Sequence, residues 1–399
     1  MSNFLFTWEL GSNSGHIAEI LPIAKLLKKR GHTVNLLFRE IHEINLNDLN
    51  NIPVFQAPVW LANLSGLPEN PISLPEVLLY CGYHQETYLT KMIDVWCNTL
   101  KKFNPDVLIA NYSPTAILAS RVLNLPVVTI GTGFYTPPQL NPLPSARPWL
   151  KNVEQRLLDS DNRVTKTINS VLNHFGSESI TSCADLFNVN KNLFLTYSEL
   201  DHFQNREANQ LNDFVGPIFE MSKGLKVAWP EDTNIKVFLY LRPDFRDLAL
   251  IIKSLSELNY TVIAVIPGLS KPDKEKFGSN NVQIFTESIQ LDSVVDDCDL
   301  AIGYGGHGLT SAMLLANIPQ AMFPLNLEQF LLAQRIEALG AGIVINIEND
   351  LPNYYELFVQ AISNKKLKKS CIQFSKKYLG HNQESQLNYI ADQIEKILE

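Results

Sequence analysis

The chain has 399 residues, of which 45% are hydrophobic and 19% are charged, values ordinary for a globular protein long enough for two domains. Its net charge of -8 argues against binding to nucleic acid, which needs clustered Lys and Arg. Five scattered cysteines without a C-x-x-C pair favour free thiols, and no apolar run reaches the roughly 18 residues of a membrane span. We therefore expect a cytoplasmic protein without a transmembrane segment.

Strand-like and helix-like segments alternate along the first half, which is typical of a parallel sheet covered by helices. A strand over residues 3–10 and a turn over 11–15 precede a helix over 16–30, whose apolar residues recur at helical spacing. Further elements are a strand over 33–38, strands over 107–110 and 127–130, and a helix over 115–123. Loop-rich regions over 53–75 and 134–149 predict a binding site.

The second half restarts near Gly216 with the same alternation. Strands are expected over residues 236–241, 261–266, 282–285, 300–303 and 320–323. An amphipathic helix from His381 is expected to pack back on the first domain. The prediction is an α/β fold with two doubly wound parallel sheets, a domain over 1–215, a domain over 216–380, and a C-terminal helix over 381–399.

Two turns lie where open parallel sheets bind ligands, beyond the carboxyl ends of strands and at helix N-termini. One covers residues 11–16 and the other covers residues 303–311. The second predicts an anion site, because its glycines permit close backbone approach and the next helix supplies free N–H groups. Thr310 and Ser311 add hydroxyl donors. The alternative is that the glycines only form a tight turn.

Residues 304–342, YGGHGLTSAMLLANIPQAMFPLNLEQFLLAQRIEALGAG, resemble the donor signature of family-one glycosyltransferases of the antibiotic and macrolide type. Residues 15–34, GHIAEILPIAKLLKKRGHTV, resemble the N-terminal G-H…R-G-H-x-V segment of the same family. Gly216 and Pro217 stand where those enzymes enter their donor domain. The resemblance implies the GT-B architecture, in which two Rossmann-like domains face a central cleft.

The resemblance also implies an activity, which is inverting transfer of a hexose from a UDP- or dTDP-sugar to a small, partly apolar acceptor. The nucleotide sugar is a co-substrate, and neither a cofactor nor a metal is expected. His16 matches the catalytic base, a role that suits a group with a pKa near neutrality. The implied donor-binding residues are Gly305, Gly306, His307, Gly308, Thr310 and Ser311 at the diphosphate, with Glu328 and Gln329 at the sugar hydroxyls.

The chain departs from the family pattern at the base. Asn111 stands where the family has the aspartate that orients the histidine. An asparagine can accept a hydrogen bond from the imidazole, but it carries no charge to stabilise an imidazolium. Glu9 and Glu19 are both candidates to supply that charge.

The donor side departs too. Tyr304, also expected at the donor phosphates, replaces the family's first histidine, His307 is an alternative phosphate contact, and Leu309 replaces a hydroxyl residue. Ser288 falls where an aromatic residue stacks on the base, so uridine and thymidine both stay open. Arg242 ends a strand, where it reaches either the diphosphate or a surface partner. The D-x-D sequence at 297–299 precedes a strand and therefore lies at the end of the sheet opposite the ligands.

Aromatic residues in the two loop-rich regions suit an apolar acceptor, unless they belong to the core. The predicted acceptor contacts are Trp60, Tyr83, Phe134 and Trp149. Two competing functions share the fold: an auxiliary protein that binds sugar nucleotides without turnover, favoured by Asn111 and Tyr304, and a sugar-nucleotide epimerase. The sequence is compatible with a homodimer and leaves the oligomeric state open.

Overall fold

A computed structural model describes the chain except for residues 12–14, 43, 45, 63, 205, 207–212, 233 and 346–351. It divides into two compact units, the first comprising Met1–Ile218 with Asn382–Glu399 and the second comprising Phe219–His381. The boundaries predicted from the sequence lie within a few residues of these divisions. Among the described helices, none combines the length and the apolar character that crossing a membrane requires.

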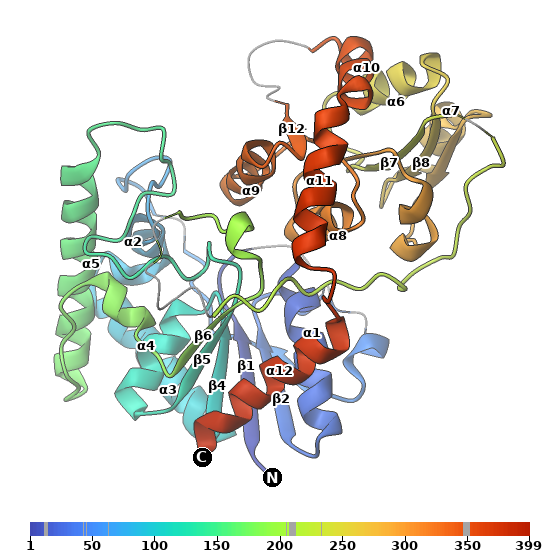
Figure 1. Ribbon diagram of the computed structural model, residues 1–399. Helices are drawn as coiled ribbons and strands as arrows, with labels where there is room; N and C mark the ends of the chain where they lie inside the picture. The colour runs from blue at the N-terminus through green and yellow to red at the C-terminus, as the bar shows by residue number, and fades with distance from the viewer. Residues whose placement is uncertain are drawn as a thin grey trace. The chain divides into compact units, whose positions relative to one another are not determined.

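The first unit contains a sheet of parallel strands in the order β3-β2-β1-β4-β5-β6 (Figure 1). The strands are β1 (Asn3–Trp8), β2 (Thr33–Phe38), β3 (Val54–Gln56), β4 (Val107–Asn111), β5 (Val127–Gly131) and β6 (Lys191–Phe194). The helices are α1 (Gly15–Lys29), α2 (Leu74–Leu78), α3 (Glu86–Phe103), α4 (Pro114–Leu123), α5 (Glu154–His174) and α12 (Gln383–Glu395).

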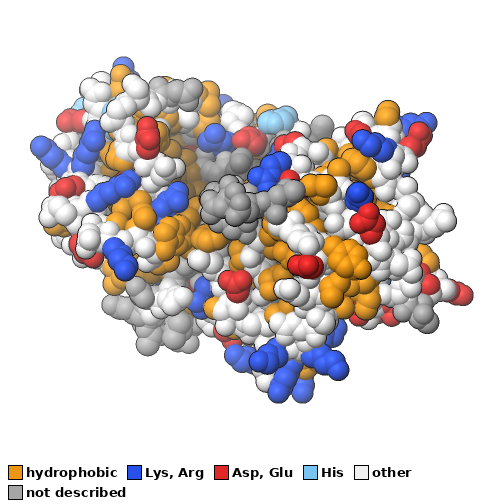
Figure 2. All heavy atoms as spheres, turned by 90° about the horizontal axis from the view of Figure 1, so that it is seen from above, with side chains coloured by type: hydrophobic (Ala, Val, Ile, Leu, Met, Phe, Trp, Pro, Cys, Tyr) orange, Lys and Arg blue, Asp and Glu red, His pale blue; other side chains and the backbone are white. Residues whose placement is uncertain are grey.

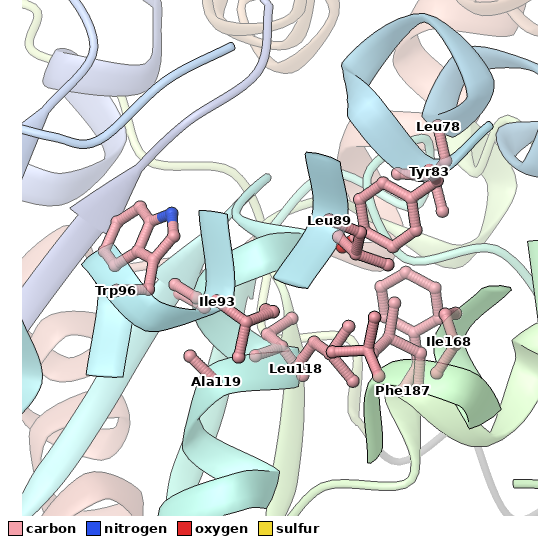
Figure 3. Close-up of a cluster of buried hydrophobic side chains, with 14 of the residues drawn as sticks. Leu78, Tyr83, Leu89, Ile93, Trp96, Leu118, Ala119, Ile168 and Phe187 are labelled. Atoms are coloured by element: carbon pink, nitrogen blue, oxygen red, sulfur yellow. The ribbon is translucent and has the colours of Figure 1, made fainter. Parts of the chain in front are cut away.

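Alternate residues of β1 supply the cores on the two faces of this sheet, as expected for a strand buried on both sides. Phe4, Phe6 and Trp8 belong to one core, together with residues of α1 and α12. Leu5 belongs to the other core, together with residues of α3, α4 and α5. Figure 3 shows part of this second core around Ile93 and Trp96.

Helix α12 joins the first unit although it follows the whole second unit in sequence. Ile390, Ala391 and Ile394 bury its apolar face in the same core as α1 (Figure 1). Arg30, just after α1, donates to Asp392 at 2.7 Å and to Glu395 at 2.6 Å. The amphipathic pattern from His381 predicts this helix, which begins after the capping residue Asn382.

The second unit repeats the same sheet plan, with parallel strands in the order β12-β11-β10-β7-β8-β9. The strands are β7 (Lys236–Tyr240), β8 (Thr261–Val265), β9 (Val282–Phe285), β10 (Leu300–Gly303), β11 (Gln320–Met322) and β12 (Gly342–Val344). The helices are α6 (Leu248–Glu257), α7 (Lys271–Phe277), α8 (His307–Leu315), α9 (Leu327–Ala338), α10 (Tyr354–Ser363) and α11 (Lys365–Lys377).

Both sheets reverse their strand order beside their first strand, between β1 and β4 in one unit and between β7 and β10 in the other. In an open α/β sheet, a crevice for ligands forms at the carboxyl ends of the strands at such a reversal. The predicted doubly wound α/β fold is confirmed, and each unit contains one such crevice position. The elements missing from the prediction include the edge strands β3, β6 and β12.

Candidate active site

The reversal in the first unit brings His16 and Asn111 together. Asn111 is the last residue of β4 and is paired in register with Trp8, the last residue of β1. The chain leaves β1, passes through residues 12–14, which lie outside the described part, and enters α1 at Gly15. His16 is therefore in the first turn of the helix that follows the strand adjoining Asn111.

A line of hydrogen bonds joins three side chains at this point. Nδ1 of His16 lies 2.6 Å from Oδ1 of Asn111, and Nδ2 of Asn111 donates to Oε2 of Glu19 at 2.7 Å. All three residues are buried, with exposed fractions of 3%, 0% and 8% respectively. Of the two carboxylates that the sequence left open as partners, Glu19 is the one connected to His16.

The direction of these hydrogen bonds assigns the protons of the imidazole. Asn111 turns its amino group to Glu19, to which it donates, and its carbonyl oxygen to His16. That oxygen only accepts, so Nδ1 of His16 carries the proton. Nε2 of the neutral ring is then left with its lone pair, as a base requires.

Aromatic rings enclose the imidazole. The ring of Trp8 stacks on it with centroids 4.8 Å apart, and the ring of Tyr135 lies 4.9 Å away at a tilt. Burial lowers the pKa of His16 from 6.5 to about 4, although the hydrogen bond to Asn111 opposes this shift. The ring is therefore neutral at physiological pH.

Gly11 fits closely against the base. Its φ is +81°, and a Cβ added there would lie 2.6 Å from Nε2 of His16. A side chain at this position would meet the nitrogen that carries the lone pair, and the backbone would be strained as well. Position 11 therefore requires glycine for two separate reasons.

The loop that carries Phe134 and Tyr135 is fixed by a buried ion pair that the sequence analysis missed. Arg206 donates through Nε to Asp201 at 2.7 Å, and their side chains are only 2% and 4% exposed. The same guanidinium donates to the carbonyl oxygens of Gly133 at 3.0 Å and Thr136 at 2.9 Å. These bonds hold Tyr135 against the imidazole.

Glu9 has a separate role from the base. It accepts hydrogen bonds from the backbone N–H of Thr115, at 2.8 Å, and from the hydroxyl of the same residue, at the start of α4. Its side chain is 1% exposed, and burial raises its pKa from 4.5 to about 7 despite these bonds. Glu9 therefore caps a helix and is not the partner of His16.

The raised pKa of Glu9 predicts a pH-dependent effect of Glu9→Gln. The folded state keeps this proton after the unfolded state has lost it, so the contribution to stability is lost as pH rises from 4.5 through about 7. The neutral amide avoids this loss and is expected to raise the free energy of unfolding by ~1–3 kcal/mol at pH 8 and by much less at pH 5. Urea unfolding at both pH values measures this, and an equal change at both would contradict it.

In the second unit, the glycine turn lies at the corresponding reversal. Gly305 has a φ of +78°, and a Cβ there would lie 3.2 Å from the carbonyl oxygen of Gln329. Gly306 caps α8, which begins at His307 and continues through Gly308. Burial lowers the pKa of His307 from 6.5 to about 4, so its ring is neutral. The turn offers an anion the free N–H groups at a helix start.

Thr310 and Ser311 need a correction, because their side chains face the interior. They are 2% and 0% exposed, and Oγ of Ser311 has no hydrogen-bond partner among the described residues. The predicted donation of both hydroxyls to a diphosphate is therefore not what the structure presents. The helical register of α8 turns these positions inward.

Tyr304 and Arg242 also differ from their predicted phosphate contacts. The Tyr304 hydroxyl accepts the backbone N–H of Arg242, and its side chain is 6% exposed against Phe245. Tyr304 thus ties the end of β10 to the end of β7. The Arg242 side chain is 58% exposed and pairs with Asp244 at 3.3 Å, which is the surface alternative.

The predicted sugar contacts begin helix α9. Gln329 accepts the backbone N–H of Leu325 at 2.9 Å through its side chain, and its own N–H donates to Asn326 at 2.9 Å. This reciprocal capping occupies the Gln329 oxygen. Glu328 is half-buried in the same first turn.

The D-x-D segment lies at the amino end of the sheet, as predicted. Asp299 accepts the backbone N–H of Lys236 at 2.9 Å, and Asp297 pairs with the Lys236 ammonium at 3.3 Å. Lys236 is the first residue of β7. The described residues contain no group of three or more His, Cys, Asp or Glu side chains placed to hold a metal ion.

The predicted acceptor residues divide between surface and core. Tyr83 is a correction, because it is 0% exposed among core side chains and its hydroxyl donates to Thr115 at 3.3 Å (Figure 3). Phe134 is half-buried with its ring 6.4 Å from that of Tyr112, and Trp60 is half-buried against Gly82. Trp149 is 43% exposed, one of the hydrophobic side chains that reach the surface, several of which Figure 2 shows in orange.

Two doubly wound parallel sheets, both in the same strand order, define the GT-B architecture. Solved structures of 14% and 16% identity share the fold. The spinosyn rhamnosyltransferase SpnG superposes with a TM-score of 0.68 over 98% of this chain and 99% of that one. The glycosyltransferase VinC, solved in complex with dTDP, superposes with a TM-score of 0.64 over the same shares.

Sequence comparison finds similarity to known glycosyltransferases over part of the chain. Residues 249–383 match the C-terminal domain of the erythromycin biosynthesis protein CIII-like family. A PGL/p-HBAD biosynthesis rhamnosyltransferase of Mycobacterium bovis is 21% identical over 276 residues, which are 65% of this chain and 60% of the relative. The chain thus spans about 60% of that curated relative's length. The predicted resemblance to GT-B glycosyltransferases of the antibiotic and macrolide type is confirmed.

Proposed function

We propose that the protein is an inverting glycosyltransferase that moves a hexose from a nucleoside-diphosphate sugar to a hydroxyl of a small, partly apolar acceptor. The observation that carries the proposal is the neutral imidazole of His16, whose hydrogen bond to Asn111 leaves Nε2 with a lone pair. The aromatic rings around it, those of Trp8, Tyr112 and Tyr135, give the base a setting that suits an apolar acceptor.

In the proposed reaction, Nε2 of His16 takes the proton of the acceptor hydroxyl while its oxygen bonds to the anomeric carbon. The bond from that carbon to the diphosphate oxygen breaks, and the nucleoside diphosphate leaves with the electron pair. Attack opposite the leaving group inverts the anomeric configuration. We assign the diphosphate to the backbone N–H groups at the start of α8, beside Gly305 and Gly306.

The nature of the donor is part of the proposal. VinC was solved with dTDP, and the Mycobacterium bovis relative and SpnG are rhamnosyltransferases. We therefore favour a dTDP-linked hexose over a UDP-linked one. Because backbone N–H groups at the start of α8 are available to the diphosphate in this proposal, we propose that transfer needs no divalent metal.

The direct test is transfer by the full chain. The protein is incubated with dTDP- and UDP-hexoses and a panel of phenols and hydroxylated lipids, with and without EDTA. Release of nucleoside diphosphate and the mass and anomeric configuration of the product are measured. A β-linked product from an α-linked donor, unaffected by EDTA, is expected. Retention of configuration would contradict the mechanism, and donor hydrolysis with no transfer would contradict the acceptor class.

One observation favours a second function. Asn111 stands in place of the charged residue that the resembled family uses, so an auxiliary protein that binds the donor without turnover is the alternative. In that case, calorimetry would detect dTDP binding that His16→Ala leaves unchanged, and no product would form with any acceptor.

Trp149→Ala tests the acceptor surface. The indole is 43% exposed, so its removal is expected to cost little stability while raising KM for an apolar acceptor ~10-fold, the loss of one aromatic contact. Tyr83→Phe is the control, because Tyr83 is a core residue and its hydroxyl is not available to an acceptor. Initial rates against acceptor concentration measure both variants. A KM that changes with Tyr83 and not with Trp149 would reverse this assignment.

A further inference from the structure

Glu19 lies on the same helix as His16, three residues further along α1, so both side chains are on one side of the helix. Asn111, at the end of β4, contacts both, at 2.6 Å from the imidazole and 2.7 Å from the carboxylate. Glu19 is 8% exposed. This buried carboxyl group therefore reaches the imidazole of His16 through a single amide.

The amide of Asn111 has two orientations with opposite consequences for His16. With the amino group toward Glu19, the carbonyl oxygen holds a proton on Nδ1 and leaves the lone pair on Nε2. With the amide reversed, its amino group faces Nδ1, the proton moves to Nε2, and Nε2 can no longer accept one. The amide of an asparagine has no preference of its own between the two orientations. A carboxylate at Glu19 accepts only from the amino group and therefore favours the first orientation.

We propose that Glu19 is a positioning residue, which through Asn111 holds the imidazole of His16 in the tautomer whose Nε2 can accept the acceptor's proton. This rests on the proposed function. Glu19 also places a carboxyl group beside position 111, where the resembled family has the carboxyl group on that residue itself. In this chain the orienting group and the charge are on two residues, and the amide joins them.

The arrangement predicts the effect of moving the charge. Glu19→Gln removes the charge, and its amide can pair with Asn111 in either direction, so both tautomers of His16 become populated. We expect kcat to fall ~10–100-fold, the range seen when outer partners of functional histidines are removed. In the double variant Glu19→Gln with Asn111→Asp, the aspartate accepts from both neighbours, so the single tautomer and most of kcat are expected to return.

Asn111→Asp alone tests whether a second carboxylate beside Glu19 can replace the amide. It would set two carboxylates within hydrogen-bond distance, and like charges that close share a proton. We expect this single variant to be less active and less stable than the double variant. A double variant no better than Glu19→Gln would overturn the proposal.

The tautomer is measured without any substrate. Nitrogen-15 shifts of His16 in histidine-labelled full chain, assigned with His16→Ala, distinguish a protonated Nδ1 from a protonated Nε2. Wild type is expected to show the proton on Nδ1 and Glu19→Gln a mixture. A wild-type proton on Nε2, or an unchanged tautomer in Glu19→Gln, would overturn the role of Glu19. An expected tautomer with no transfer activity would instead count against the proposed function.

Glu76→Gln is the matched control for nonspecific effects of losing a buried carboxylate. Glu76 is 0% exposed in the same unit, pairs with Arg156 at 2.6 Å and accepts the backbone N–H of Ile72 at 2.9 Å. Its replacement is expected to lower stability and leave the His16 tautomer unchanged. A tautomer change in Glu76→Gln equal to that in Glu19→Gln would show that the effect is merely structural.

Discussion

His16→Ala is expected to lower kcat by ~10²–10⁴-fold, the usual contribution of a positioned general base. The loss follows from the geometry, because the hydrogen bond from Nδ1 to Asn111, which in turn donates to Glu19, leaves the lone pair of this neutral ring on Nε2. The KM for the donor should change little, since the proposed diphosphate site is in another unit of the chain. Steady-state rates with both substrates varied measure the two effects separately.

His32→Ala is the control for this prediction. His32 lies in the same unit and bonds to Glu395 at 2.8 Å, so its removal weakens the attachment of α12 and not the base. Its kcat should stay within a few-fold of wild type while its melting temperature falls. If His16→Ala retained full kcat, His16 would not be the base.

Gly11→Ala is expected to abolish most activity while leaving the protein folded. The added methyl group would lie 2.6 Å from Nε2 of His16, and φ at this position is +81°, so the variant carries both a steric block and backbone strain. We expect a fall in kcat of the same order as in His16→Ala, together with a stability loss of ~1–2 kcal/mol from the left-handed backbone.

Gly15→Ala is a matched control at the other end of the same turn. A Cβ at Gly15 meets no atom of the described residues within 4 Å, and its backbone is not in the left-handed region. Alanine there should be tolerated, since it also favours the helix that begins at this residue. Equal losses in Gly11→Ala and Gly15→Ala would mean that the turn as a whole matters, and not the contact with Nε2.

The sequence predicts the central strands because each is a short, nearly continuous apolar run between turn residues. The strand over 33–38 and that over 300–303 agree with β2 and β10 in both bounds. The edge strands β3, β6 and β12 escaped because they are short and only partly buried, so their residues lack that pattern. Their placement depends on pairing with a neighbour, which no local pattern records.

At the site, the sequence identified His16 and Asn111 as a pair and left two carboxylates open. Only the fold distinguishes them, because Glu9 follows β1 directly and reaches Thr115, whereas Glu19 is on α1 and reaches Asn111. Arg206 was missed because it lies far along the chain from the loop that it holds.

The donor side shows a different limit. A motif gives the order of residues and not the direction of each side chain. The Tyr304 hydroxyl bonds to the backbone of Arg242, and Ser311 lies in the core. Each residue aligns with a position of the family signature but does not present its side chain for the phosphate contact expected there. Helical register decides the second case, because it places Ser311 of α8 in the interior.

The return of α12 to the first unit has a consequence for biosynthesis. Residues 1–218 emerge from the ribosome first, but the part of the α1 surface that packs against α12 is not covered until residues 382–399 follow, after all of the second unit. The first unit therefore keeps its α12-binding surface exposed while the second unit is synthesised and folds. A nascent chain of this protein exposes the α1 surface to chaperones for that interval, and stalling in the later part of the message would prolong it.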